Sequence, residues 1–171
     1  MPVASISVEI EALRNDWRAA MKLISLVDYA FISKDYLREK LGFQTARQFF
    51  EAILANQWVC EDLAEHAKAF VCPWGSEGVY YLDMAGSTMH HVSTIRLDNV
   101  VETIGAGDAF IGASLAGLSR WNLPLAQVLK TACEVASAKC LKPGFALAPE
   151  DKQVWEQRLQ RELGTTNAYA A

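Results

Sequence analysis

A glycine-rich segment in the second half of the chain carries the residues best suited to chemistry. It reads VETIGAGDAFIG over Val101–Gly112, with Gly105 and Gly107 on either side of Ala106 and with Asp108 directly after them. Glycines let backbone N–H groups approach an anion closely, and a helix that begins there points its positive dipole end at the same place. A carboxylate repels a bound phosphate, but it becomes useful when it accepts a proton from a hydroxyl between them. The segment is a candidate for phosphoryl transfer; the four residues GAGD alone favour the alternative, a strand-to-helix turn with Asp108 as N-cap.

Two further features are weaker candidates. The GSEG loop (Gly75–Gly78) follows an apolar run, and taken alone it is a β-turn between two strands. Cys133 and Cys140 are seven residues apart, which places them on one face of a helix. None of the four cysteines has CxxC spacing or a nearby histidine cluster, so no zinc site is expected. The remaining histidines and three tryptophans are interpreted as surface, structural or packing residues: His66, His90, His91, Trp17, Trp121 and Trp155.

The elements that must position these residues follow from hydrophobic periodicity. Strands are expected at Ser5–Ile10, Val27–Ile32, Ala69–Trp74, Gly78–Leu82 and Met89–Val92, the last of them returning antiparallel. Helices are expected around residues 13–24, 36–41, 46–56, 63–68, 109–118, 125–135 and 150–163. Strands that alternate with helices predict an α/β fold with a largely parallel sheet flanked by helices.

Composition narrows the class of protein. The chain has 171 residues, 51% hydrophobic and 21% charged, with a net charge of −4. This acidic balance argues against nucleic acid and anionic membrane as partners. The opening MPVASISVEIE lacks the features of a signal peptide, and no apolar run reaches the length of a membrane span. We expect a cytoplasmic protein with free thiols.

The glycine-rich segment resembles the second signature of the ribokinase/pfkB family of carbohydrate kinases, D-T-x-G-A-G-D-x-F-x-x-G. The matching positions are Thr103, Gly105, Ala106, Gly107, Asp108, Phe110 and Gly112, whereas Glu102 stands where the family usually has Asp. Within the family, residues 6–11, 32–44, 71–78 and 132–145 resemble ketohexokinases, in the same order. The resemblance covers nearly all of residues 5–148 and implies a ribokinase-like fold.

The resemblance also implies a role for each candidate. Asp108 is expected to be the general base and the one sugar-contacting group, with the backbone amides of Gly105, Ala106, Gly107 and Asp108 as an anion hole. ATP with Mg²⁺ is the expected co-substrate, and no tightly bound cofactor is expected. The expected ATP contacts are Ser33, Gly75, Ser76, Glu77, Gly78, Gly105, Gly107, Cys133 and Cys140. Ser33 and Tyr36 stand at the ends of the N-x-x-E motif that serves magnesium in other members, so the metal ligands are not identified.

By the same resemblance, residues 1–164 are the C-terminal, ATP-binding half of a pfkB-type kinase domain, and residues 165–171 are a loose tail. The N-terminal half and its lid, which often forms a homodimer contact, are missing from this sequence, and the chain alone is expected to be inactive. The implied reaction is phosphorylation of fructose to fructose 1-phosphate. Two alternatives stay open: a non-catalytic nucleotide-binding fragment or pseudoenzyme, and a pfkB kinase for another sugar or a nucleoside.

Overall fold

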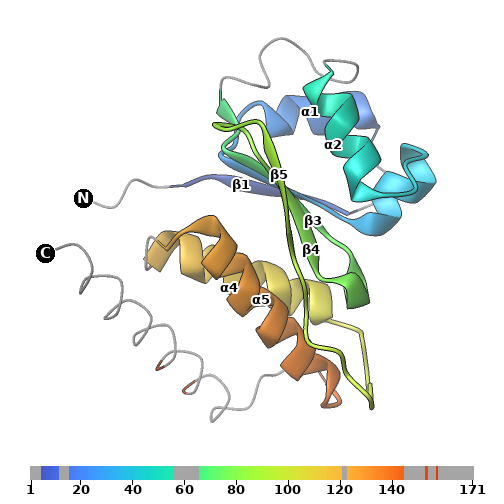
Figure 1. Cartoon of the computed structure of the whole chain (residues 1–171), viewed down its shortest axis with the longest axis vertical. Coiled ribbons are helices and arrows are strands. Elements are labelled where there is room, and N and C mark those ends of the chain that lie inside the picture. Colours follow the sequence, from blue (N-terminus) through green and yellow to red (C-terminus); the bar gives the residue numbers. More distant parts are fainter. Residues whose placement is uncertain are drawn as a thin grey trace, which may run out of the picture. The chain divides into compact units, whose positions relative to one another are not determined.

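A computed structural model describes residues 5–11, 16–55, 66–120, 123–144, 153 and 157 (Figure 1). The chain divides into two compact units, residues 1–93 and residues 94–171, and each is described by itself. Within the described residues, no helix is long and apolar enough to cross a membrane. The helix expected at residues 63–68 lies half outside the described residues, the helix expected at 150–163 lies outside them except for residues 153 and 157, and the tail lies wholly outside them.

The first unit is built on a five-stranded sheet whose spatial order follows the sequence. Its strands are β1 (Ser7–Ile10), β2 (Tyr29–Ile32), β3 (Ala69–Pro73), β4 (Val79–Asp83) and β5 (Thr88–Val92). The first three pair in parallel, and β4 and β5 continue the sheet as an antiparallel hairpin. Parallel strands require crossover connections, which here contain α1 (Trp17–Ile24), a π-helical turn η1 (Tyr36–Lys40) and α2 (Ala46–Leu54). The expected α/β fold and the antiparallel return are confirmed. The sheet is mixed rather than largely parallel, because the hairpin makes two of its four strand pairings antiparallel.

Asp28 ties together the amino ends of the three parallel strands. Its carboxylate accepts a hydrogen bond from the Ile6 N–H at 2.9 Å and forms an ion pair with Lys68 Nζ at 2.8 Å. Its backbone carbonyl accepts the Lys68 N–H at 2.6 Å. The hydrogen bond from Lys68 lowers the pKa of Asp28 and outweighs a small opposing effect of burial. One side chain therefore contacts both neighbours of the central strand β2 just where their pairing begins.

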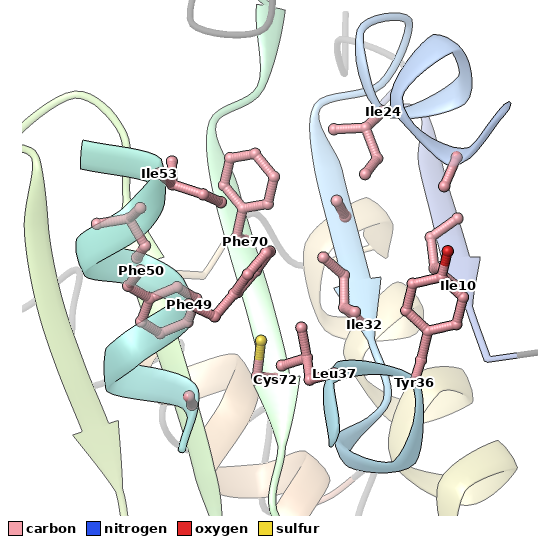
Figure 2. Packing of buried hydrophobic residues seen from close by; sticks show 14 of the residues in the cluster. Ile10, Ile24, Ile32, Tyr36, Leu37, Phe49, Phe50, Ile53, Phe70 and Cys72 are labelled. Atoms are coloured by element: carbon pink, nitrogen blue, oxygen red, sulfur yellow. The ribbon is translucent and has the colours of Figure 1, made fainter. Parts of the chain in front are cut away.

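The core of this unit lies between the sheet and its helices. Figure 2 shows Phe49 and Ile53 of α2 pointing toward Phe70 of β3, and the rings of Phe49 and Phe70 meet edge to face at 6.3 Å. Ile32 of β2 is also fully buried in this core. A capping box formed by Thr45 and Gln48 starts α2. Burial of these aromatic and branched side chains is the main stabilising contribution in the unit.

The second unit contains α4 (Ala106–Arg120) and α5 (Leu125–Cys140), which pack against each other. α4 begins at Ala106, earlier than the expected start at residue 109, so the end of the GAGD segment is its first turn. The two glycines predicted a turn before the helix, whereas the structure places only Gly105 before it and Gly107 within its first turn. α5 extends beyond the expected residue 135 to Cys140.

The α4–α5 contact predicts opposite effects for two glycine substitutions in one helix. A Cβ added at Gly117 would lie 2.8 Å from Val128 Cγ1, whereas a Cβ at Gly112 would meet nothing within 4 Å. We expect Gly117→Ala to destabilise the chain by about 1–3 kcal/mol through overpacking. Gly112→Ala should be neutral or stabilising by up to ~1 kcal/mol, since alanine is the better helix former. Urea unfolding of the two variants measures the difference, and equal midpoints would contradict the packing described here.

Candidate functional site

The candidate residues fall into two groups, one in each unit. Ser33 and the GSEG loop belong to the first unit, and the GAGD turn (Gly105–Asp108), Cys133 and Cys140 belong to the second. We describe each group within its own unit.

Ser33 and the GSEG loop follow the carboxyl ends of adjacent parallel strands. Ser33 comes directly after β2, and Gly75 comes two residues after β3. The register pairs Phe31 with Val71, so the chain leaves both strands at the same edge of the sheet. In open α/β sheets, ligands bind outside this edge. The structure therefore brings these two predicted segments together, although they are some forty positions apart in the sequence.

Ser33 also begins the turn that follows β2. Its N–H donates to the Ile10 carbonyl at 3.0 Å, and its Oγ accepts the Tyr36 N–H at 3.1 Å. The hydroxyl hydrogen of Ser33 is not used by that bond and stays available as a donor. Lys34, the next residue, places its Nζ 5.6 Å from the centroid of the Trp74 ring, which precedes the GSEG loop. Sequence reasoning did not identify Lys34, because a lone lysine carries no motif.

The GSEG loop is a tight turn closed by its own backbone. Gly75 and Gly78 have φ angles of +62° and +99°, which side-chain-bearing residues rarely adopt. The Trp74 N–H donates to the Gly78 carbonyl at 2.7 Å, and the Gly78 N–H donates to the Gly75 carbonyl at 3.0 Å. Residues 75–77 thereby form a single 3₁₀ turn, η2 (Gly75–Glu77). Both glycines are required by the conformation of the turn itself.

Two residues of the β4–β5 hairpin hold Glu77. The Tyr80 hydroxyl donates to Glu77 Oε2 at 3.0 Å, and His91 Nε2 donates to the Glu77 carbonyl at 2.7 Å. Burial, followed by the hydrogen bond to the Glu77 carboxylate, raises the pKa of Tyr80 and keeps its hydroxyl protonated. By contrast, the exposed Ser76 hydroxyl has no hydrogen bond within the described part of the chain. Sequence reasoning assigned His91 a surface or structural role but did not find its contact with Glu77, because the register that pairs Tyr80 with His91 is visible only in the structure.

The GAGD turn forms the start of α4. Gly105 has a φ of +80°, and its carbonyl accepts the Ala109 N–H at 3.0 Å. The Ala106 N–H donates to the Thr103 carbonyl at 3.1 Å, so this expected anion-hole amide already has a partner. The amides of Gly105, Gly107 and Asp108 have no hydrogen bond among the described residues; Gly107 and Asp108 are exposed and Gly105 is half-buried. Free amides in the first turn of a fifteen-residue helix favour an anion.

Glu102 and Lys139 fasten the segment before the GAGD turn to the end of α5. The Lys139 side chain is only 3% exposed, and its Nζ lies 3.3 Å from the Glu102 carbonyl and 3.6 Å from Glu102 Oε2. The same carboxylate oxygen accepts the Gly144 N–H at 2.8 Å. The N–H groups of Val101 and Glu102 both donate to the Cys140 carbonyl. Glu102, where this sequence departs from the family signature, is thus held by contacts within the chain.

Cys133 and Cys140 both lie on α5, as their spacing predicted. Cys133 is buried and Cys140 is half-buried. Burial, with a smaller effect of the neighbouring Glu134 carboxylate, raises the pKa of the Cys133 thiol to about 12. Cys133 is therefore a neutral packing group at physiological pH. Trp17 packs edge to face on Phe49, and Trp121 and Trp155 lie outside the described residues.

Magnesium has no ready-made ligand cluster in the part of the chain that the structure describes. No group of three or more His, Cys, Asp or Glu side chains there is arranged to hold a metal ion. Mg²⁺ is commonly held by substrate phosphates, waters and one or two carboxylates.

We expect Lys139→Met to destabilise the second unit. The change leaves the Glu102 carboxylate with the Gly144 amide but without its buried cation. Loss of a buried charged hydrogen-bond donor typically costs about 1–3 kcal/mol. Lys130→Met, an exposed position on the same helix, is the matched control and should change stability by less than ~0.5 kcal/mol. Denaturant unfolding measures the loss of stability in each variant. Equal losses would show that the contact between Lys139 and Glu102 contributes nothing to stability.

The raised pKa of Cys133 predicts slow alkylation in the folded chain. With a pKa of about 12, only ~10⁻⁴ of the thiol is ionised at pH 8, and the thiolate is the reactive species. Iodoacetamide should label the more exposed Cys140 first and Cys133 only after unfolding, as followed by peptide mass spectrometry. An unfolded thiol has a pKa of ~8.5, so Cys133 also makes the chain less stable as pH rises from there toward 12. Rapid native labelling of Cys133 would refute its burial.

Comparisons with known proteins agree with this arrangement. The pfkB family of carbohydrate kinases matches residues 12–152. Mouse ketohexokinase is 31% identical over 140 residues, which cover 82% of this chain and 43% of that protein. The chain therefore spans less than half the length of this curated relative.

Solved structures give the fold. Aminoimidazole riboside kinase from Salmonella enterica, complexed with aminoimidazole riboside and an ATP analogue, superimposes with a TM-score of 0.63 at 21% identity, over 81% of this chain and 45% of that one. Ribokinase from Thermotoga maritima gives a TM-score of 0.63 at 18% identity, over 85% and 46% of the two chains. The ribokinase-like fold expected from the sequence is thus confirmed, and the extent of the family match shows that this chain belongs to the pfkB family of carbohydrate kinases.

Proposed function

We propose that this chain carries the phosphoryl-transfer apparatus of an ATP-dependent ketohexose kinase that converts fructose to fructose 1-phosphate. The observation that supports this most directly is the GAGD turn, where two free amides and an exposed carboxylate share the first turn of α4. Family membership makes a phosphotransferase the expected class of enzyme, and the relative at 31% identity is a ketohexokinase.

In the proposed reaction, the oxygen of a sugar hydroxyl forms a bond to the γ-phosphorus of ATP, and the bond from that phosphorus to the bridging oxygen of ADP breaks. Asp108 accepts the hydroxyl proton. A free alcohol is too weak an acid for a carboxylate to deprotonate beforehand, so the proton moves late, when the forming P–O bond has acidified the hydroxyl.

The free amides of Gly107 and Asp108 are the proposed anion hole. Negative charge spreads over the γ-phosphoryl oxygens during transfer, and preorganised N–H donors stabilise it without reorganising at the moment of reaction. The positive end of α4 acts in the same direction. Ala106 contributes to the hole only if its bond to the Thr103 carbonyl breaks. We therefore assign the larger share to Gly107 and Asp108 in the first turn of α4, and the amide of Gly105, which directly precedes the helix, completes the proposed hole.

ATP is the proposed co-substrate, and Ser33 and the GSEG loop are its proposed contacts in the first unit. Both follow carboxyl ends of parallel strands, and the Ser76 hydroxyl is free to bind a ligand. Cys133 and Cys140 remain candidates for the adenine side as small, polarisable groups. Homodimerisation and a cytoplasmic location stay predictions.

The acceptor has one specific alternative. Structures with this fold include a kinase for aminoimidazole riboside, and most sugar-contacting groups have no assigned residue in this chain. A nucleoside or another sugar is therefore the alternative acceptor to fructose. A further alternative is that the protein binds a nucleotide without catalysing a reaction.

The decisive variant is Asp108→Asn, which removes the proton acceptor and keeps the shape of the side chain. We expect turnover of the full-length protein to fall at least ~10²–10³-fold, the loss typical of removing one oxyanion donor, while ATP still binds. A coupled ADP-release assay with fructose, ribose, aminoimidazole riboside or no acceptor measures turnover, and calorimetry measures ATP binding.

Each outcome of this experiment separates the candidates. Acceptor-dependent turnover with fructose alone supports the ketohexose assignment, and preference for another acceptor replaces it. ATP binding without turnover on any acceptor favours the non-catalytic alternative. Near wild-type turnover by Asp108→Asn would refute the role of Asp108. The 171-residue chain by itself is expected to bind ATP weakly and to show no fructose-dependent ADP release.

A further inference from the structure

The peptide unit between Glu77 and Gly78 is held at both of its ends. Its carbonyl, on Glu77, accepts the His91 Nε2–H at 2.7 Å. Its N–H, on Gly78, donates to the Gly75 carbonyl at 3.0 Å. Because a peptide unit is planar and rigid, these two bonds fix its orientation within the GSEG loop.

This peptide unit precedes a glycine, so it can flip at little steric cost. Gly78 has φ +99° and ψ −134°, and glycine crosses between such regions at little steric cost. A flip would remove the Gly78–Gly75 hydrogen bond and turn a carbonyl where an N–H had been. The glycine that permits the observed conformation of the loop therefore also permits the flipped one.

The β4–β5 hairpin supplies the restraint. Tyr80 and His91 are directly opposite each other in the register, and their rings lie 4.4 Å apart at 30°. Tyr80 also contacts the Trp74 ring edge to face at 6.2 Å, and its hydroxyl binds the Glu77 carboxylate. Glu77, Tyr80 and His91 thus form a connected set, which we call the loop brace.

We propose that His91 is a positioning residue that locks the Glu77–Gly78 peptide in one orientation and so preorganises the GSEG loop for nucleotide. The affinity claim rests on the proposed function of that loop. Glu77 becomes an internal anchor, because its carbonyl and one carboxylate oxygen are engaged within the brace, and Ser76 is left as the ligand-facing side chain. Preorganisation raises affinity because ordering is not required at the moment of binding.

The test must separate the effect of the His91 N–H donor from the effect of its aromatic ring. His91→Phe keeps an aromatic ring against Tyr80 and removes the donor, whereas His91→Gln replaces Nε2 with an amide N–H at similar reach and removes the ring. His90→Phe is the matched control, since His90 is the adjacent residue and stacks on Tyr81 at 4.7 Å. Each variant is made in the full chain, and its stability is measured by urea unfolding.

Two readouts decide the proposal. Amide hydrogen exchange of Gly78 without nucleotide reports the lock itself, and ATP affinity by calorimetry reports its consequence. We expect His91→Phe to speed Gly78 exchange and to weaken ATP binding about 3- to 10-fold, the range for one net hydrogen bond. His91→Gln should largely restore both, and His90→Phe should change neither.

The proposal is overturned if His91→Phe leaves Gly78 exchange and ATP affinity unchanged. It is equally overturned if His90→Phe has the same effect, which would indicate general weakening of the hairpin, or if His91→Gln is as impaired as His91→Phe, which would assign the effect to stacking. If the full-length wild-type protein binds no ATP, the proposed function of the loop fails, whereas Gly78 exchange still decides whether His91 locks the peptide.

Discussion

Parallel pairing of β1, β2 and β3 is the constraint on which the first unit depends. Parallel strands must be joined by crossovers, and this requirement places α1, η1 and α2 between them. It also brings the carboxyl ends of β2 and β3 to one edge, where Ser33 and the GSEG loop begin. Asp28 acts at the opposite edge, where it contacts both neighbours of β2. The amino-terminal edge thus maintains the pairing that the candidate ligand-binding edge requires.

In the second unit, too, the candidate site and the contacts that hold it in place lie on different elements: the site is at the start of α4, and the contacts are at the end of α5. The GAGD turn has free amides because it is the first turn of α4. The segment before it is fixed to the end of α5 through Glu102, Lys139 and the Cys140 carbonyl. Lys139 is almost fully buried, so this contact is screened little by solvent. A longer Glu in place of the usual Asp is accommodated by bonding to Lys139 and Gly144.

The GSEG loop shows how a glycine-rich turn acquires a single conformation. Glycine permits the positive φ angles but does not select them. Selection comes from groups outside the turn, here Tyr80 and His91 on the hairpin that follows it. Glu77, for which an ATP contact is predicted, is also engaged by its own hairpin.

The sequence by itself determined the family, the α/β class, most helix and strand positions, and the residues of the GAGD turn. These depend on short-range periodicity and on a contiguous motif, which local chemistry dictates. Only the tertiary structure decided that α4 begins at Ala106, that the Ala106 amide is already bonded, and that His91 holds Glu77. His91 and Glu77 lie on different elements, and their contact is set by the strand register of the hairpin, of which single-residue patterns carry no record. The start of α4 is a local feature, but glycines permit both a turn and a helix, so the sequence did not choose between them.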